Sequence, residues 1–227
     1  MPLAIPRLRE SRRVATAAFV VTSLLDAALA GRDPEVWQHR RWATKPALMP
    51  LLMASASHQP RTVDIAQAAS WIGDIALLRD RDDRWFRLGV ASFAVTHLAY
   101  TASLLPHARL SATGRRNAAL VATAAAAGAL SLRRDARRTR PDLADAVAVY
   151  SGIIGTMAAT AAAVPIDRQG GASLRCGALL FLASDSLIGA TTFTAPDAPR
   201  RLESLVMTTY TAGQLMLARA IRDLAAS

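Results

Sequence analysis

The feature of this sequence that most restricts its fold is the grouping of apolar residues into long blocks separated by arginine clusters. The blocks hold about 16 to 22 residues each, and about 20 residues of α-helix cross a hydrocarbon layer of about 30 Å. In a soluble amphipathic helix or strand, apolar residues would instead recur with a period of about 3.6 or 2 residues. The grouping therefore predicts a chain that crosses a membrane several times.

Lipid offers no partner to backbone N–H and C=O groups, so a spanning segment must be an α-helix or part of a closed β-barrel. The apolar blocks are too long for barrel strands and lack their alternation. We therefore predict an all-α fold, a polytopic transmembrane helical bundle of about eight helices, with residues 1–227 forming a single domain. The expected spans lie approximately at residues 14–30, 46–57, 63–78, 88–105, 117–132, 143–164, 174–194 and 202–221.

Three of these spans have unusual compositions. The first resembles a secretory signal, but because further spans follow we expect it to remain as a helix. The second is short for a crossing unless it takes in residues from its flanks, and Pro46 and Pro50 suit a broken or irregular helix, which is tolerated where backbone lines a cavity. The fifth is mostly alanine and therefore only weakly hydrophobic.

The net charge of +10 does not indicate nucleic-acid binding, because the arginines lie in short connections and aromatic residues make up only 5% of the chain. Stretches such as RLRESRR, RDRDDR and RRDARRTR instead predict segments that flank membrane spans and meet anionic headgroups. A composition rich in alanine and arginine suggests a bacterium with a high GC content, so we expect the bacterial cytoplasmic membrane. The single cysteine, Cys176, excludes an intrachain disulfide and a cysteine-rich metal site.

Two aspartates interrupt very apolar blocks: Asp74 in WIGDIALL and Asp185 in FLASDSLIGA. An ionisable group inside a span costs about 2.5 to 3.5 kcal/mol on insertion scales and by default marks a functional site. Two carboxyl groups in one water-poor site suit general acid–base catalysis, in which one donates a proton while the other stays ionised. The structural alternative is that each aspartate pairs with an arginine or caps a broken helix.

Other polar residues lie in stripes along single helix faces. In the fourth span, Phe93, His97 and Tyr100 follow one another at helical spacing. In the eighth, Tyr210 and Gln214 lie four residues apart. Several helices that each present polar groups along one stripe predict a shared polar pocket. Its candidate members are His97, Tyr100, Tyr150, Ser184, Tyr210 and Gln214.

Lys45 and the possible metal ligands leave alternatives open. Lys45, in TKPALMPLL, either binds an anionic group such as a phosphate at the membrane surface or snorkels from a helix start. His97 with the two aspartates is a conceivable metal site, but the H-E-x-x-H spacing is absent. No G-x-S-x-G elbow or phosphate-binding glycine loop occurs either. We therefore expect neither a metal nor another cofactor.

Six motifs, in order from about Lys45 to Leu217, carry a resemblance: KPALMPLL, GDIALL, FRLGVASFAVTHLAY, Y…GTM, GALLFLASDSLIG and YTAGQLML. Together they resemble the YhhN family of membrane proteins, which includes the lysoplasmalogenases. The resemblance implies eight membrane helices and hydrolysis of the vinyl ether bond of lysoplasmalogens, which yields a fatty aldehyde and a glycerophospho-ethanolamine or -choline. The alanine-rich fifth span and the arginine-rich connections carry no motif of the family.

The resemblance also implies roles for the residues singled out above. Asp74 and Asp185 correspond to the two intramembrane acids of the family, and Lys45 becomes a candidate for binding the lipid phosphate. The residues implied to orient the acids, the water or the headgroup are His97, Tyr100, Tyr150, Tyr210 and Gln214, and Ser184 joins them as a candidate for substrate binding.

The sequence thus predicts a membrane-embedded hydrolase that takes a lysophospholipid from the bilayer and has both acids facing one water-accessible cavity. The alternative is a proton-coupled transporter of a small amphiphile, in which the same acids form a relay and a polar path reaches both faces. A third reading is an intramembrane aspartyl protease, because Gly73-Asp74 resembles a short Gly-Asp signature.

Overall fold

The structure, a computed structural model, describes residues 4–56, 59–79 and 83–226. Within these ranges it contains eight α-helices and no strand, which confirms the predicted all-α bundle. The helices are α1 (Ala4–Ala30), α2 (Pro34–Ser55), α3 (Arg61–Leu77), α4 (Asp83–Leu104), α5 (Ala112–Thr139), α6 (Ala144–Ala163), α7 (Gly171–Gly189) and α8 (Arg201–Ala225). Two short 3₁₀ turns, η1 (Leu105–His107) and η2 (Pro141–Leu143), follow α4 and precede α6, and a π-helical turn, η3 (Ala190–Thr194), continues α7.

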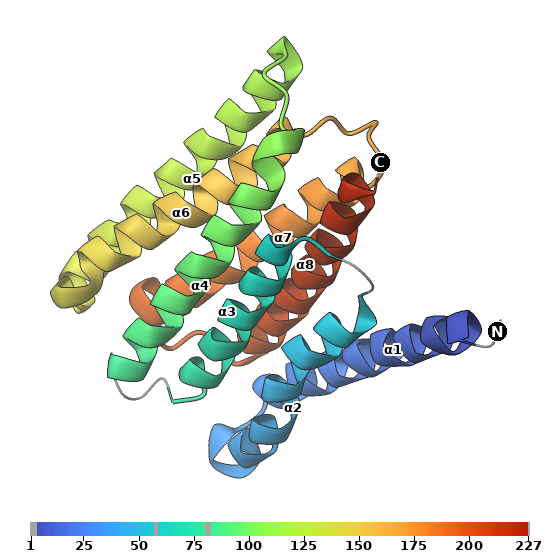
Figure 1. Cartoon of the computed structure of the whole chain (residues 1–227). Helices are drawn as coiled ribbons and strands as arrows, with labels where there is room; N and C mark the ends of the chain where they lie inside the picture. The colour runs from blue at the N-terminus through green and yellow to red at the C-terminus, as the bar shows by residue number, and fades with distance from the viewer. Residues whose placement is uncertain (1–3, 57–58, 80–82, 227) are drawn as a thin grey trace.

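Consecutive helices pack in pairs: α1 on α2, α3 on α4, α5 on α6 and α7 on α8. Contacts of α8 with α1, of α4 with α6 and of α2 with α3 join the pairs into one bundle. Figure 1 shows α5 and α6 along one edge of the bundle and α1 and α2 at the opposite edge, with the other four helices between them. The central position of α4 and α7 is what brings polar residues from distant parts of the chain together.

Four segments of the described chain are long and apolar enough to cross a membrane: Arg9–Ala30, Asp83–His107, Pro141–Ala163 and Gly171–Thr194. They correspond to α1, α4, α6 and α7 with the turns next to them. The remaining four expected spans form helices as well, but they are shorter, richer in alanine or interrupted by charged residues.

The second span takes in residues from its N-terminal flank, since α2 begins at Pro34, but the prediction of a broken helix is wrong, because α2 continues through both internal prolines to Ser55. Pro50 has no N–H group, so the carbonyl of Pro46, one turn earlier, loses its usual helical partner. The indole Nε1 of Trp71 on α3 donates a hydrogen bond to that carbonyl at 2.8 Å. A neighbouring helix thus satisfies the group that the proline leaves unpaired, as is common in membrane helices.

Close contact between α7 and α8 shapes the centre of the bundle. A Cβ atom on Gly213 would lie 2.9 Å from the carbonyl oxygen of Gly177, and one on Gly177 would lie 3.0 Å from the backbone nitrogen of Leu217. Only residues without a side chain allow the two backbones to meet in this way, which is typical of membrane helices. The contact places the backbone of Phe181 against α8, and its buried ring packs edge-on to that of Tyr210.

Candidate active site

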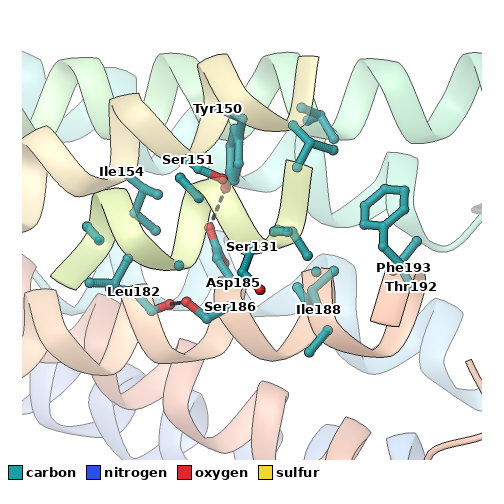
Figure 2. A pocket seen from close by; sticks show the side chains of 18 of the residues that line it. Ser131, Tyr150, Ser151, Ile154, Leu182, Asp185, Ser186, Ile188, Thr192 and Phe193 are labelled. Carbon is teal, nitrogen blue, oxygen red and sulfur yellow. Dashed lines mark hydrogen bonds between the residues drawn. The ribbon is translucent and has the colours of Figure 1, made fainter. Parts of the chain in front are cut away.

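Asp185 on α7 is the centre of a polar cluster formed by three helices. The hydroxyl group of Tyr150, on α6, donates a hydrogen bond to Asp185 Oδ2, as Figure 2 shows. His97 Nε2, on α4, lies 3.2 Å from the same carboxylate oxygen and 3.1 Å from the tyrosine hydroxyl. The imidazole is fully buried, whereas the side chain of Asp185 keeps 10% of its surface exposed. We call these three residues the Asp185 cluster.

The exposed part of Asp185 faces a cavity of about 380 Å³ that α4, α5, α6, α7 and η3 enclose. Most of its wall is apolar, with Phe86, Phe93 and Ile154 on the inner side. Among the described residues that line it, Asp185 is the one carboxylic acid. Besides Tyr150 and Asp185, the polar groups of the wall are the hydroxyls of Ser131, Ser151, Ser186, Thr192 and Thr194. A carboxyl group in such a wall can meet a long apolar molecule.

The π-helical turn η3 shapes one end of this cavity. It places Phe193 edge-on to Phe86 of α4, with ring centroids 6.5 Å apart. Phe193 also packs in a small apolar cluster with Leu143, Val147 and Leu132. These side chains close the cavity toward the adjacent end of the bundle, and π-helical turns are frequent at functional sites.

Asp74 on α3 lies in a second cluster, almost completely buried at 1% exposure. Lys45 Nζ, from α2, lies 3.6 Å from Asp74 Oδ1, and the hydroxyl of Tyr210, from α8, donates to Oδ2 at 2.7 Å. We call these three residues the Asp74 cluster. The side chain of Lys45 is 9% exposed and reaches the interior from the middle of α2, where Asp74 is its ion-pair partner.

A buried network of hydrogen bonds continues from the Asp74 cluster. Tyr100 donates to Gln214 Oε1 at 2.6 Å, and Gln214 Nε2 donates to Ser70 Oγ at 2.7 Å. The Ser70 and Thr96 hydroxyls lie 3.0 Å apart. Because all of these side chains are buried and none of them lines the cavity, Tyr100 and Gln214 serve to hold α3, α4 and α8 together around Asp74.

The two acids therefore lie in separate hydrogen-bonded clusters. Asp185 lines the cavity, whereas Asp74 lies outside its lining. The ring of Phe181 bridges the clusters, with its centroid 4.6 Å from that of His97 and 5.3 Å from that of Tyr210. One aromatic side chain thus contacts a member of each cluster.

Two further results concern Ser184 and residues that the sequence analysis did not single out. Ser184 is buried and donates to the carbonyl of Val206 on α8 at 3.0 Å, away from the cavity. Gly128 and Ser131 of α5 do line the cavity, although the alanine-rich fifth span offered no motif that pointed to them.

In the ranges that the structure describes, no three His, Cys, Asp or Glu side chains gather in a group suited to a metal ion.

A third buried acid, Asp26, completes the polar interior at the α1–α2 side of the bundle. The guanidinium group of Arg41 donates to its two carboxylate oxygens at 3.3 and 3.2 Å, and the hydroxyl of Thr44 donates at 2.6 Å. The pairing of Asp26 with Arg41 across the α1–α2 contact indicates a structural role.

The sequence model of the YhhN family matches residues 40–221. The chain belongs to the YhhN family. The match includes every member of the Asp74 and Asp185 clusters, while the whole of α1, with Asp26, precedes it. Family membership and the four membrane-length helices together make this YhhN chain a membrane protein. The curated proteins and the solved structures gave no match to it.

Proposed function

We propose that this YhhN protein is a hydrolase of the bacterial cytoplasmic membrane that cleaves the vinyl ether bond of a lysoplasmalogen. The observation that carries the proposal is Asp185, a carboxyl group held by residues of two other helices in the wall of an apolar cavity. An acid in such a place can reach a reactive bond next to a long hydrocarbon chain. Membership of a family that includes lysoplasmalogenases supports the same substrate class.

The reaction consumes one water molecule and returns the proton that it uses. Asp185, in its neutral form, donates a proton to the vinyl carbon remote from the ether oxygen, and the C=C π bond becomes the new C–H bond. Water then adds to the oxocarbenium carbon and gives its proton to the Asp185 carboxylate. In the resulting hemiacetal the C–O bond to glycerol breaks, the hydroxyl proton passes to the departing oxygen, and the fatty aldehyde and the glycerol hydroxyl are released. Proton transfer by a positioned group contributes about 10² to 10⁴ in rate.

The other polar residues support Asp185 in this scheme. Tyr150 and His97 fix the orientation of the carboxyl group and stabilise its charge after the proton has left. Asp74, the second acid, has no place in the cavity lining, so we assign it a positioning role. Asp74 is connected to the Asp185 cluster by a series of contacts: it accepts a hydrogen bond from Tyr210, and the ring of Phe181 packs on both Tyr210 and His97.

The test is release of aldehyde from lysoplasmenyl-ethanolamine by the purified protein in detergent. We expect turnover by the wild type, loss of turnover in Asp185→Asn and wild-type turnover in Asp197→Asn, which makes the same change at an exposed site in the α7–α8 connection. A lysolipid with a saturated ether should remain intact, because it has no C=C bond to protonate. Wild-type turnover by Asp185→Asn would refute the mechanism.

The alternative, a proton-coupled transporter of a small amphiphile, is separated from the hydrolase by the same preparation in proteoliposomes. A folded wild type that releases no aldehyde but moves protons when an amphiphile is added would support the transporter. Aldehyde release without such proton movement would exclude it.

A further inference from the structure

The cavity that holds Asp185 opens sideways, between α5 and α7. Its exposed lining residues lie on these two helices and on η3, and they include Gly128 and Ser131 of α5 and Ser186 of α7. The inner wall, in contrast, contains buried side chains such as Phe93 and Ile154. In a membrane-spanning bundle, a sideways opening faces lipid chains rather than water.

The packing of α5 explains why this opening exists. Along its length α5 packs on α6, and within the described residues it makes no extended contact with α7. Near their C-terminal ends the α5 helix and the α7–η3 segment do meet: Leu132 lies against Gly189, and Thr194 of η3 donates to Asp135 at 2.8 Å. The gap is therefore closed at the end of the bundle and open along its side.

The same contacts set the register of the two helices. Residue numbers rise together along α5 and α7, since residue 132 lies opposite 189 and residue 135 opposite 194. One helical turn back from the first of these contacts brings Gly128 to the level of Asp185. Both residues line the cavity.

Gly128 differs from the glycines at which helices touch. A Cβ atom on Gly128 would meet no heavy atom within 4 Å, whereas one on Gly213 would clash with the backbone of α7. Glycine inside a helix costs about 1 kcal/mol relative to alanine, and here no packing contact offsets that cost. The absence of a side chain at Gly128 leaves open space at the mouth of the cavity, at the level of Asp185.

We propose that Gly128 is the specificity-determining residue of a lateral entrance through which a single-chain amphiphile passes from the bilayer to Asp185. That the amphiphile is an ether lysolipid rests on the proposed function; the entrance itself rests on the geometry of α5 and α7. A cavity of about 380 Å³ lies near the small end of the range for ligand pockets, about 300 to 1,000 Å³, and suits one hydrocarbon chain rather than two.

The test compares Gly128→Leu with Gly152→Leu. Gly152, on α6, is likewise exposed and has no heavy atom within 4 Å of an added Cβ, but it lines a neighbouring groove between α5 and α6 and is not part of the lining of the Asp185 cavity. The probe is a lysophospholipid with a saturated ether chain, which binds but has no vinyl bond to cleave, and its binding to purified protein is measured by native mass spectrometry. Aldehyde release from lysoplasmenyl-ethanolamine is measured in parallel.

We expect Gly128→Leu to weaken probe binding at least about tenfold and Gly152→Leu to change it less than about twofold, since one misplaced methylene in a pocket is worth about tenfold or more. Equal binding by the two variants would overturn the entrance, whatever the hydrolase assay shows. Probe binding that depends on Gly128, in a protein that releases no aldehyde, would support the entrance and refute the proposed hydrolysis. If Gly128→Leu fails to fold, Ala124→Leu, one turn away in the same lining, takes its place with the same two outcomes.

Discussion

Removing one partner of the Lys45–Asp74 pair should destabilise the bundle more than removing both. The two side chains are 9% and 2% exposed, and their charged atoms lie 3.6 Å apart. Loss of one partner of a buried pair costs about 3 to 5 kcal/mol, because the other charge stays buried without compensation. In Lys45→Met the hydroxyl of Tyr210 still donates to Asp74, so we expect the lower end of this range, about 3 kcal/mol.

That loss corresponds to a factor of about 100 to 200 in the unfolding equilibrium. We expect Asp74→Asn to be similarly costly, because it leaves the lysine buried alone. The double variant, Lys45→Met with Asp74→Asn, has no charge to bury and should return to within about 1 kcal/mol of the wild type. The assay is reversible unfolding by sodium dodecyl sulfate in mixed micelles, followed by circular dichroism.

The matched control is the exposed pair between Arg87 and Asp142. Its charged atoms are closer, at 2.7 Å, but the two side chains are 52% and 48% exposed. Exposed pairs contribute about 0 to 1 kcal/mol, so Asp142→Asn should have a small effect despite the shorter distance. A double variant less stable than both single variants, or a Lys45→Met variant as stable as Asp142→Asn, would refute the reasoning from burial. Slow hydrolysis by a restored double variant is expected if Asp74 positions the Asp185 cluster.

Two further predictions concern single hydrogen bonds. Tyr150→Phe removes the hydroxyl that donates to Asp185 but keeps the ring contact with His97. It should lower kcat for aldehyde release about 10- to 100-fold, because a hydrogen bond to a charged group is worth about 1.5 to 3 kcal/mol. An unchanged kcat would contradict the role of the hydroxyl. Trp71→Phe should destabilise the protein by about 1 to 3 kcal/mol, because it leaves the carbonyl of Pro46 unpaired. Pro50→Ala restores an N–H group for that carbonyl, so in a double-mutant cycle it should stabilise the Trp71→Phe background more than the wild type, and strict additivity would count against this account.

The sequence predicted helices well because apolar blocks and lipid leave few alternatives, but it misplaced the start of α2. Arg40, Arg41 and Lys45 lower the hydropathy of its first turns, so the apolar block indicates a later start. In the structure, Arg41 and Lys45 point to Asp26 and Asp74 on other helices. Charge compensation between helices is a property of the packed bundle, which a pattern along one segment does not contain.

The stripe on α4 shows a similar limit. Its polar residues do face the interior, as predicted, but His97 joins the Asp185 cluster and Tyr100 the network around Asp74. Residues three apart on a helix differ by about 60° in direction, which is enough to face two different neighbouring helices. The sequence therefore predicted polar residues in the interior without predicting that they form two clusters rather than one pocket. Nor could it point to Gly128, whose contribution is the absence of atoms.

The two acids differ in what surrounds them. The charged groups at the α1–α3 side form two pairs of opposite sign, Arg41 with Asp26 and Lys45 with Asp74. Asp185, by contrast, contacts the imidazole of His97 at 3.2 Å, and no lysine or arginine of the described chain pairs with it. A carboxyl group without a fixed cation beside it is free to pass a proton to a substrate and take one back, which is what the proposed reaction requires of Asp185.

This contrast predicts the effect of giving Asp185 a fixed cation. Leu182 lies three residues earlier on α7 and lines the same cavity, so a lysine there can pair with the carboxylate. Leu182→Lys should therefore lower kcat for aldehyde release at least about tenfold, while Leu182→Met, which is similar in length but neutral, should keep most of it. The measurement is aldehyde release at saturating substrate, together with the melting temperature of both variants. An equal loss of kcat in the two variants would mean that the volume of the side chain, rather than its charge, matters at this wall. Full activity of Leu182→Lys would show that Asp185 is not the proton donor.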